Sequence, residues 1–179
     1  MKTSIYLPLL ALLLSFPQHA DDSAITQIRQ QYKAVRDALP TLSKQELELS
    51  GHSTDGGGVT AYRDNKKNIQ LLHAEMFGES GKRIEEHYYK NGVLFFAYQA
   101  DHRYNVPYFV TAEDAKADGI EAFDPKKTKI YENRYYFANG KLVQWLNKDK
   151  KTVSLTTTEA RDAEKDLVKF STELLNMFK

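Results

Sequence analysis

Hydrophobic residues near the start of the chain recur at helical spacing. The first such run after residue 20 consists of Ile25, Ile28, Tyr32, Val35 and Leu39. Intervals of three and four residues place these side chains on one side of an amphipathic helix. Asp22 or Ser23 is positioned to cap the start of this helix, and Pro40 ends it.

The end of the chain shows the same pattern. Its apolar stripe consists of Ala160, Ala163, Leu167, Phe170, Leu174 and Phe178. Residues 156–159, Thr-Thr-Thr-Glu, precede the stripe and match a capping box. Narrow stripes of this kind are typical of helices that pack on a core. We therefore expect an N-terminal and a C-terminal helix, packed together on one face of a sheet.

The sheet is predicted from the segments between the two helices. These segments are rich in β-branched and aromatic residues, and turn-forming residues separate several of them. They cover residues 46–52, 59–63, 68–77, 82–90, 93–99, 129–138 and 141–147. Their order predicts an antiparallel meander of about five to seven strands. The fold class is therefore α+β.

Two hairpins stand out within this meander. Residues 87–96 and 135–144 each place aromatic residues before an Asn-Gly pair and apolar residues after it. Asn-Gly suits a type I′ turn, because both central residues of that turn need a positive φ. We interpret the repetition as two similar solutions to one turn problem.

The hairpin turns also predict the pairing of residues across the strands. In the first hairpin Tyr88 would lie opposite Phe95, and in the second Trp145 would lie opposite Arg134. These registers put bulky side chains on both faces of the sheet. One face is the core beneath the helices, and the other has two explanations. Either the long connection 100–127 covers it, or it is an exposed surface used for binding.

The binding hypothesis names aromatic residues and one arginine, which are side chains enriched at interface anchors. The candidates are Tyr98, Tyr104, Tyr108, Arg134 and Trp145. Three of them lie in or beside the connection 100–127, in which Thr111 is expected to cap a short helix. This connection is either functional or an insertion in the domain.

Histidine and glutamate residues suggest a second kind of site. If a three-residue loop joins the strands 68–77 and 82–90, His73 faces His87 and Glu75 faces Glu85. The four side chains then share one face and could bind zinc or act as a proton switch, as in a metal-dependent hydrolase. A shift of one residue dissolves the cluster, because Glu75 then faces Ile84.

Other catalytic or cofactor motifs are not found in the sequence. Ser53 lies in Gly-His-Ser-Thr-Asp, which lacks the second glycine of a nucleophile elbow. The glycines at 56–58 precede a predicted strand, whereas a phosphate-binding loop precedes a helix. We therefore predict no catalytic residue and no cofactor other than the zinc considered above.

The first 20 residues resemble a secretory signal. Lys2 provides a positive start, residues 5–16 are apolar, and residues 17–20 form the cleavage region. The apolar run is shorter than the about 20 residues needed to span a bilayer. We expect cleavage after Ala20, a single domain over residues 21–179, and a soluble periplasmic or secreted protein without stable membrane insertion.

Composition limits the possible partners. Outside the signal the chain carries 24 basic and 24 acidic residues, because only Lys2 of the 25 Lys and Arg lies within it. This balance argues against nucleic acid as a partner. The chain has no cysteine, so its core must hold the fold without disulfides. We predict a non-enzymatic exported binding protein, such as an inhibitor, immunity-type or accessory factor of the cell envelope. Its protein or small-molecule ligand is unspecified.

Overall fold

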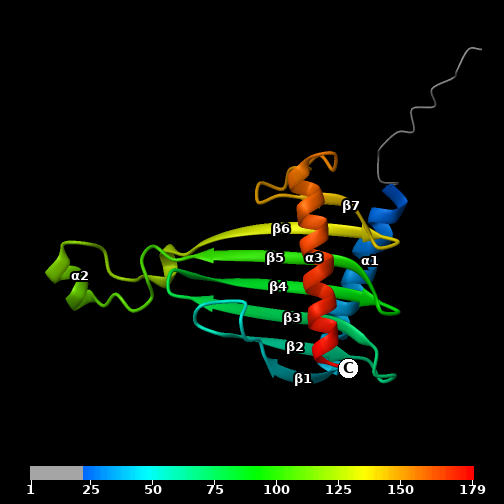
Figure 1. The fold of residues 1–179 in the computed structure, drawn as a ribbon, viewed down its shortest axis with the longest axis horizontal. Helices are drawn as coiled ribbons and strands as arrows, with labels where there is room; N and C mark the ends of the chain where they lie inside the picture. The colour runs from blue at the N-terminus through cyan, green and yellow to red at the C-terminus, as the bar shows by residue number, and fades with distance from the viewer. Residues whose placement is uncertain (1–21) are drawn as a thin grey trace, which may run out of the picture.

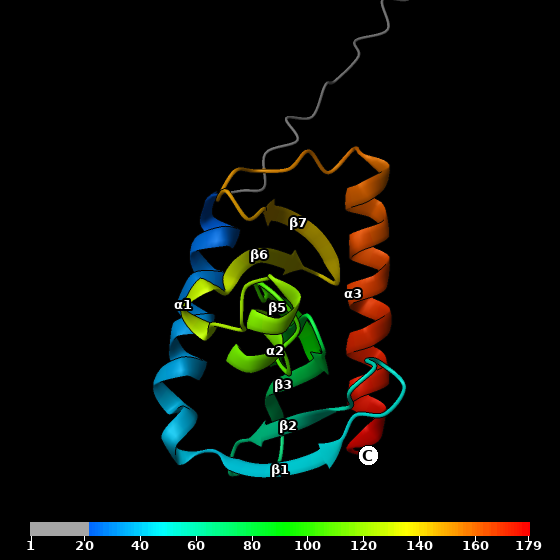
Figure 2. The same ribbon diagram turned by 90° about the vertical axis from the view of Figure 1, so that its left-hand side faces the viewer.

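The computed structural model describes residues 22–179, in which an antiparallel sheet lies between two long helices (Figures 1 and 2). The predicted signal lies outside these residues. The elements are α1 (Asp22–Ala38), η1 (Leu39–Thr41), β1 (Ser43–Glu48), β2 (Gly57–Arg63), β3 (Ile69–Gly78), β4 (Gly81–Lys90), β5 (Val93–Arg103), α2 (Ala112–Asp118), η2 (Pro125–Lys127), β6 (Lys129–Ala138), β7 (Lys141–Leu146) and α3 (Thr158–Met177).

The strands form one meander in which each strand pairs with the next along the chain, in the order β1 to β7. The predicted α+β class, the meander and the two terminal helices are therefore confirmed. The predicted strand 46–52 begins and ends too late, because β1 is Ser43–Glu48 and His52 lies in the following turn. In the described part of the chain, no helix has the length and apolar character required to cross a membrane.

The ends of the helices follow from local chemistry. Pro40 lies in the 3₁₀ turn that follows α1, and no α-helix continues through it. At the start of α3, the Thr157 hydroxyl accepts a hydrogen bond from the Ala160 amide at 3.2 Å. Helix α2 begins with a full capping box, in which Thr111 accepts from the Asp114 amide and the Asp114 side chain accepts from the Thr111 amide. Each cap satisfies backbone donors that the first helical turn leaves unpaired.

The two long helices cover opposite faces of the sheet, as Figure 2 shows. Ile25, Ile28 and Val35 of α1 pack with Tyr88 and Phe96. On the other face, α3 contributes to two clusters. The buried residues of these clusters are Leu49, Val59, Ala61, Leu72, Ala74, Met76, Tyr89, Ala97, Tyr135, Phe137, Leu142, Trp145, Ala160, Leu167, Leu174 and Phe178.

This arrangement corrects the prediction that both helices pack on one face. The hairpins have bulky side chains on both faces, and each buried face needs its own cover. The second cover is a helix and not the connection 100–127. Both explanations offered for the second aromatic face therefore miss α1, which buries much of that face.

The two Asn-Gly turns have the predicted conformation. Asn91 and Gly92 have φ values of 52° and 77°, and Asn139 and Gly140 have 51° and 74°. These positive values at both central residues are those of a type I′ turn. Each turn is followed by a shift of register that the sequence analysis did not anticipate.

The register shifts are β-bulges at equivalent places in the two hairpins. Beyond Tyr89 opposite Leu94, Tyr88 pairs with Phe96, so Phe95 is the extra residue. Likewise Phe137 pairs with Leu142 and Tyr136 with Gln144, which leaves Val143 unpaired. The predicted pairs Tyr88 with Phe95 and Arg134 with Trp145 are therefore wrong. The first bulge lets both Phe95 and Phe96 join the cluster beneath α1.

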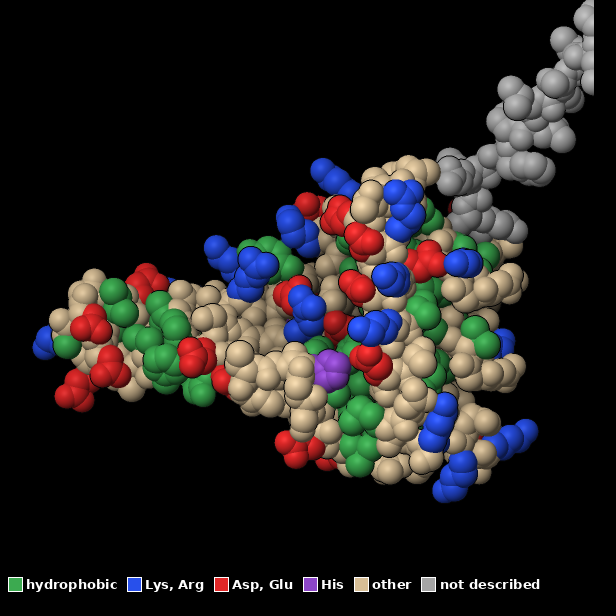
Figure 3. All heavy atoms as spheres, viewed as in Figure 1, with side chains coloured by type: hydrophobic (Ala, Val, Ile, Leu, Met, Phe, Trp, Pro, Cys, Tyr) green, Lys and Arg blue, Asp and Glu red, His purple; other side chains and the backbone are tan. Residues whose placement is uncertain are grey.

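The connection between β5 and β6 forms an arm that projects beyond the end of the sheet (Figure 1). Asn105 holds its base together by donating a hydrogen bond to the Ala122 carbonyl at 2.9 Å, and Phe123 packs edge-on against Tyr104. Figure 3 shows apolar and acidic side chains gathered on this arm. Tyr108, Phe109 and Ile120 are each more than half exposed.

Candidate ligand-binding cleft

A row of three side chains crosses the sheet on the face that α1 covers. Glu86 on β4 pairs with Tyr98 on β5, and Tyr98 pairs with Arg134 on β6. Residues directly opposite in neighbouring strands lie on the same face, so the three side chains are adjacent. The next row, Tyr88, Phe96 and Tyr136, lies beneath α1 and is buried.

Helix α1 supplies the other wall. A cleft of about 410 Å³ lies between this helix and strands β4 to β6. It is lined by Ile28, Arg29, Tyr32, Arg36, Glu86, Phe96, Tyr98, Glu132, Arg134 and Tyr136. The helical residues follow one another at helical spacing and therefore face the sheet together. The volume lies within the range of about 300–1,000 Å³ typical of small-molecule sites.

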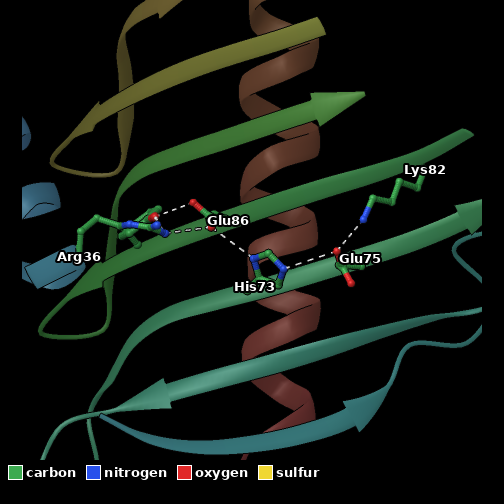
Figure 4. A network of polar contacts seen from close by, with 6 residues as sticks. Arg36, His73, Glu75, Lys82 and Glu86 are labelled. Atoms are coloured by element: carbon green, nitrogen blue, oxygen red, sulfur yellow. Dashed lines mark hydrogen bonds and ion pairs between the residues drawn. The ribbon is translucent and has the colours of Figure 1, made fainter. Parts of the chain in front are cut away.

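Glu86 joins the cleft to a chain of polar contacts that runs across β3 and β4 (Figure 4). Its carboxylate accepts hydrogen bonds from the Tyr88 hydroxyl at 2.6 Å and from Arg36 at 3.3 Å. His73 Nδ1 also lies 3.3 Å from this carboxylate, and its Nε2 lies 3.9 Å from Glu75. A carboxylate is an acceptor only, so Nδ1 is the donor to Glu86.

The ionisation of Glu86 follows from these contacts. Burial opposes the charged form, but the hydrogen bonds from His73 and Tyr88 and the charge of Arg36 outweigh burial and lower its pKa. Burial raises the pKa of the Tyr88 phenol, and the charge of Glu86 and its hydrogen bond with the phenol raise it further, whereas the hydrogen bond with Arg36 works in the other direction. Glu86 is thus held as a carboxylate and Tyr88 as a hydrogen-bond donor.

The opposite side of the cleft contains a second carboxylate with its own donors. Glu132 accepts a hydrogen bond from the Tyr98 hydroxyl at 2.6 Å and from Arg134 at 2.8 Å. These two hydrogen bonds lower the pKa of Glu132 despite partial burial. The Arg134 guanidinium also lies over the Tyr98 ring, 5.6 Å from its centroid. Tyr98 and Arg134 are therefore fixed in orientation by the same carboxylate.

Arg29 differs from the other two arginines of the cleft. Its guanidinium lies 5.8 Å from the centroid of the Tyr136 ring. Among residues 22–179, no carboxylate lies within ion-pair distance of Arg29 and no hydrogen bond joins it to another side chain. Arg29 lines the cleft and is exposed to solvent.

Comparison with models of known families, with curated proteins and with solved structures found no match for this chain. The function must therefore be argued from the site.

The five predicted binding residues lie in three different places. Tyr98 and Arg134 meet in the cleft, as described above. Tyr104 and Tyr108 belong to the arm at the far end of the sheet, where Tyr108 packs edge-on against Phe109. Trp145 is only 6% exposed, packs on Tyr135 beneath α3, and donates from Nε1 to Asn133 at 3.0 Å. Trp145 is thus a core residue and not part of an exposed surface.

The structure does not assemble the predicted metal cluster. Strands β3 and β4 are joined so that His73 pairs with Glu86 and Glu75 with Ile84, which is the alternative register. His73 and Glu75 consequently lie on the α1 face, and Glu85 and His87 on the α3 face. Within residues 22–179, no group of three or more acidic or histidine side chains is arranged to hold a metal ion.

Glu85 and His87 instead form a buried pair beneath α3. His87 is fully buried, and its Nε2 donates to Glu85 at 3.2 Å. Gln99 donates to the same carboxylate at 2.8 Å. Burial works against the charge on Glu85, yet the hydrogen bonds from His87 and Gln99 and the charge of Arg83 lower its pKa. His87 Nδ1 has no hydrogen-bond partner among the described residues.

The helical wall of the cleft was not predicted from the sequence. Tyr32 and Ile28 were assigned to the core stripe of α1, and Arg29 and Arg36 were not considered. A signal was present, because Arg29, Tyr32 and Arg36 follow at intervals of three and four residues beside that stripe. Without knowing which face of the sheet α1 covers, however, these arginines could not be placed near Arg134.

Proposed function

We propose that the protein is an exported, non-enzymatic binding protein that holds a small ligand in the cleft between α1 and strands β4 to β6. The observation that carries this proposal is the convergence of Tyr98 and Arg134 with Arg29 and Arg36 around a space of about 410 Å³. Two of these residues were nominated from the sequence, and the other two come from a distant segment of the chain.

The character of the lining supports binding. Ligand sites commonly combine apolar and aromatic walls with a few fixed polar groups that set orientation. Here Phe96 and Tyr136 provide aromatic walls, while Tyr98 and Arg134 are held by Glu132. Side chains fixed before binding lose little conformational freedom when a ligand arrives, which favours affinity.

Export belongs to the proposal because of residues 1–20. A positive start, an apolar run and a short cleavage region are the parts of a secretory signal. A binding role in the cell envelope or outside the cell is consistent with such a signal. The inhibitor, immunity-type and accessory roles all fit a binding protein of this kind, and the cleft favours a small ligand.

The test is a ligand-observed NMR screen of the purified protein against a mixture of small acids, bases and neutral aromatic compounds. We expect hits that are lost in Tyr98→Ala, which removes one wall of the cleft. Tyr131→Ala is the matched control, since Tyr131 pairs with Asp101 on the other face and carries Arg103 over its ring at 5.2 Å.

Hits that persist in Tyr98→Ala but disappear in Tyr131→Ala would place the ligand on the other face and overturn the proposal. Absence of any hit for the wild-type protein would overturn it as well. Circular dichroism of both variants checks that each retains the fold, because both tyrosines are only partly buried.

A further inference from the structure

Positive charges outnumber negative charges among the residues that line the cleft. Arg29, Arg36 and Arg134 contribute three positive charges, and Glu86 and Glu132 contribute two negative charges. An arginine remains charged at any physiological pH, and both carboxylates have lowered pKa values for the reasons given above. The residues that line the cleft therefore carry a net charge of plus one.

The cleft also has more unused hydrogen-bond donors than unused acceptors. Glu86 already accepts from Tyr88, Arg36 and His73, and Glu132 accepts from Tyr98 and Arg134. Each guanidinium carries five N–H donors, and the hydrogen bonds to these carboxylates use only a few of them. A ligand that enters the cleft thus meets unused donors more readily than unused acceptors.

We infer that the ligand is a small monocarboxylate with an aromatic or other apolar body, and that Arg29 binds its carboxylate. The inference rests on the proposed function. A guanidinium presents two parallel N–H groups that match the two oxygens of a carboxylate. Arg29 is the arginine of the cleft without a carboxylate partner among the described residues, so its fork is available.

The rest of the cleft specifies the body of the ligand. Tyr32 and Phe96 pack edge-on at 5.1 Å, and Phe96 packs in the same way against Tyr136 at 5.1 Å. These rings form an apolar floor beside the arginines, where an aromatic group of the ligand gains both burial and ring contacts. The net charge of plus one is neutralised by a single negative charge, which favours a carboxylate over a phosphate dianion.

The experiment compares ligands that share one carbon skeleton. Isothermal titration calorimetry at low salt measures binding of 3-phenylpropionate, 3-phenylpropanamide and 3-phenylpropan-1-amine to the wild-type protein. We expect the acid to bind at least about tenfold more tightly than the amide, because the amide forfeits charge-assisted hydrogen bonds. The amine should bind least, and affinity for the acid should fall as salt is added.

Variants locate the carboxylate within the cleft. Arg29→Gln should weaken binding of 3-phenylpropionate at least about tenfold, and Arg29→Lys should recover part of the loss through its charge. Lys33→Gln is the control, because it makes the same change of charge one turn away on α1, where Lys33 pairs with Asp37. Affinity that is unchanged in Arg29→Gln, or reduced equally in Lys33→Gln, would overturn the assignment of Arg29.

The ligand class and the proposed function fail in different ways. Equal or tighter binding of the amide or the amine, sensitive to Tyr98→Ala, would overturn the carboxylate class and leave the cleft as a binding site. Tighter binding of 2-phenylethyl phosphate than of the acid would overturn the choice of a monoanion. Failure of all these probes, together with an NMR screen without hits, would overturn the proposed function itself.

Discussion

Glu85 and Glu86 are neighbours on β4 whose side chains serve opposite faces of the sheet. Glu86 receives hydrogen bonds from Tyr88, Arg36 and His73 beside α1, and Glu85 receives them from His87 and Gln99 beneath α3. Both carboxylates are largely removed from water, and both are nevertheless held in the charged form. A buried carboxylate is stable only with such partners, so each glutamate fixes the side chains around it.

The ionisation of Glu85 and Glu86 makes the free energy of unfolding depend on pH. An unfolded glutamate has a pKa of about 4.3, and both folded values are lower. The folded state therefore binds fewer protons, so its extra stability is present above the unfolded pKa and disappears as pH falls through the folded pKa. We expect the free energy of unfolding, measured with urea at constant ionic strength, to decline as pH is lowered from about 5 towards 3.

Glu85→Gln and Glu86→Gln separate the two contributions. Each variant should be less stable than wild type at pH 7, and each should show a shallower decline in acid because one titrating group has been removed. A decline in acid that remains as steep in both variants as in wild type would contradict this account and assign the effect to other carboxylates.

Trp145 illustrates how a residue type associated with binding can serve the core. Its ring packs on Tyr135 with centroids 5.2 Å apart, and its indole nitrogen is satisfied by Asn133. Trp145→Ala should reduce the free energy of unfolding by about 3–5 kcal/mol, the cost typical of removing a large buried ring. Urea denaturation provides the measurement.

Trp145→Phe is the informative companion, because it retains a buried ring and removes the hydrogen bond to Asn133. We expect a smaller loss of stability than in Trp145→Ala and unchanged ligand binding in the cleft, which lies on the other face of the sheet. A Trp145→Phe protein that keeps wild-type stability but no longer binds the ligand would restore Trp145 as a binding residue.

At the scale of the elements, similar caps begin two helices with very different surroundings. Thr111 caps α2 on the exposed arm, and Thr157 caps α3. Helix α3 buries Ala160, Leu167, Ser171 and Leu174, whereas α2 buries Ala115 alone. Most of the stability of a protein helix comes from its packed face and not from its intrinsic propensity. The cap of α3 should therefore contribute more to the global free energy of unfolding than the cap of α2.

This difference gives a matched prediction. Thr157→Ala should lower the global free energy of unfolding by about 1 kcal/mol, because α3 is part of the cooperative core. Thr111→Ala should leave the global value nearly unchanged and speed hydrogen exchange in residues 112–118, since the arm can open locally. Equal effects of both substitutions on urea denaturation would show that the arm unfolds together with the sheet.

At the scale of the whole molecule, the two faces of the sheet carry different groups of polar side chains. The α1 face carries the cleft with its net positive charge, and the α3 face carries the buried pair of Glu85 and His87. The arm adds a third region at the end of the strands. Its residues 104–124 include five acidic side chains and one lysine, in contrast to the balanced charge of the chain as a whole.

The proposed export of the chain can be tested directly. Cells that express the full chain should yield a product that begins at Asp21 in the periplasmic or culture fraction, because a signal peptidase would cut after Ala20. Deletion of residues 2–20 should retain the protein in the cytoplasm. N-terminal sequencing and cell fractionation provide the readout, and a full-length product confined to the cytoplasm would exclude the signal.

Most helices and strands of this protein could be predicted from local sequence patterns. Helical stripes, strand composition and Asn-Gly turns are local features, and they placed both helices, the meander and the two type I′ turns. Even the capped helix within the connection followed from Thr111 and its neighbours. Local sequence is sufficient here because hydrogen bonding and conformational preference act over a few residues.

Which side chains come into contact depends on the tertiary fold and could not be predicted from the sequence. A shift of register by one residue moves a side chain to the other face of the sheet. The bulge at Val143 therefore places Trp145 in the core, and the tight β3–β4 turn separates His73 and Glu75 from Glu85 and His87. The positions of α1 and α3 on opposite faces then brought Arg29 and Arg36 to Tyr98 and Arg134. Such contacts depend on packing between distant segments, for which local spacing carries no information.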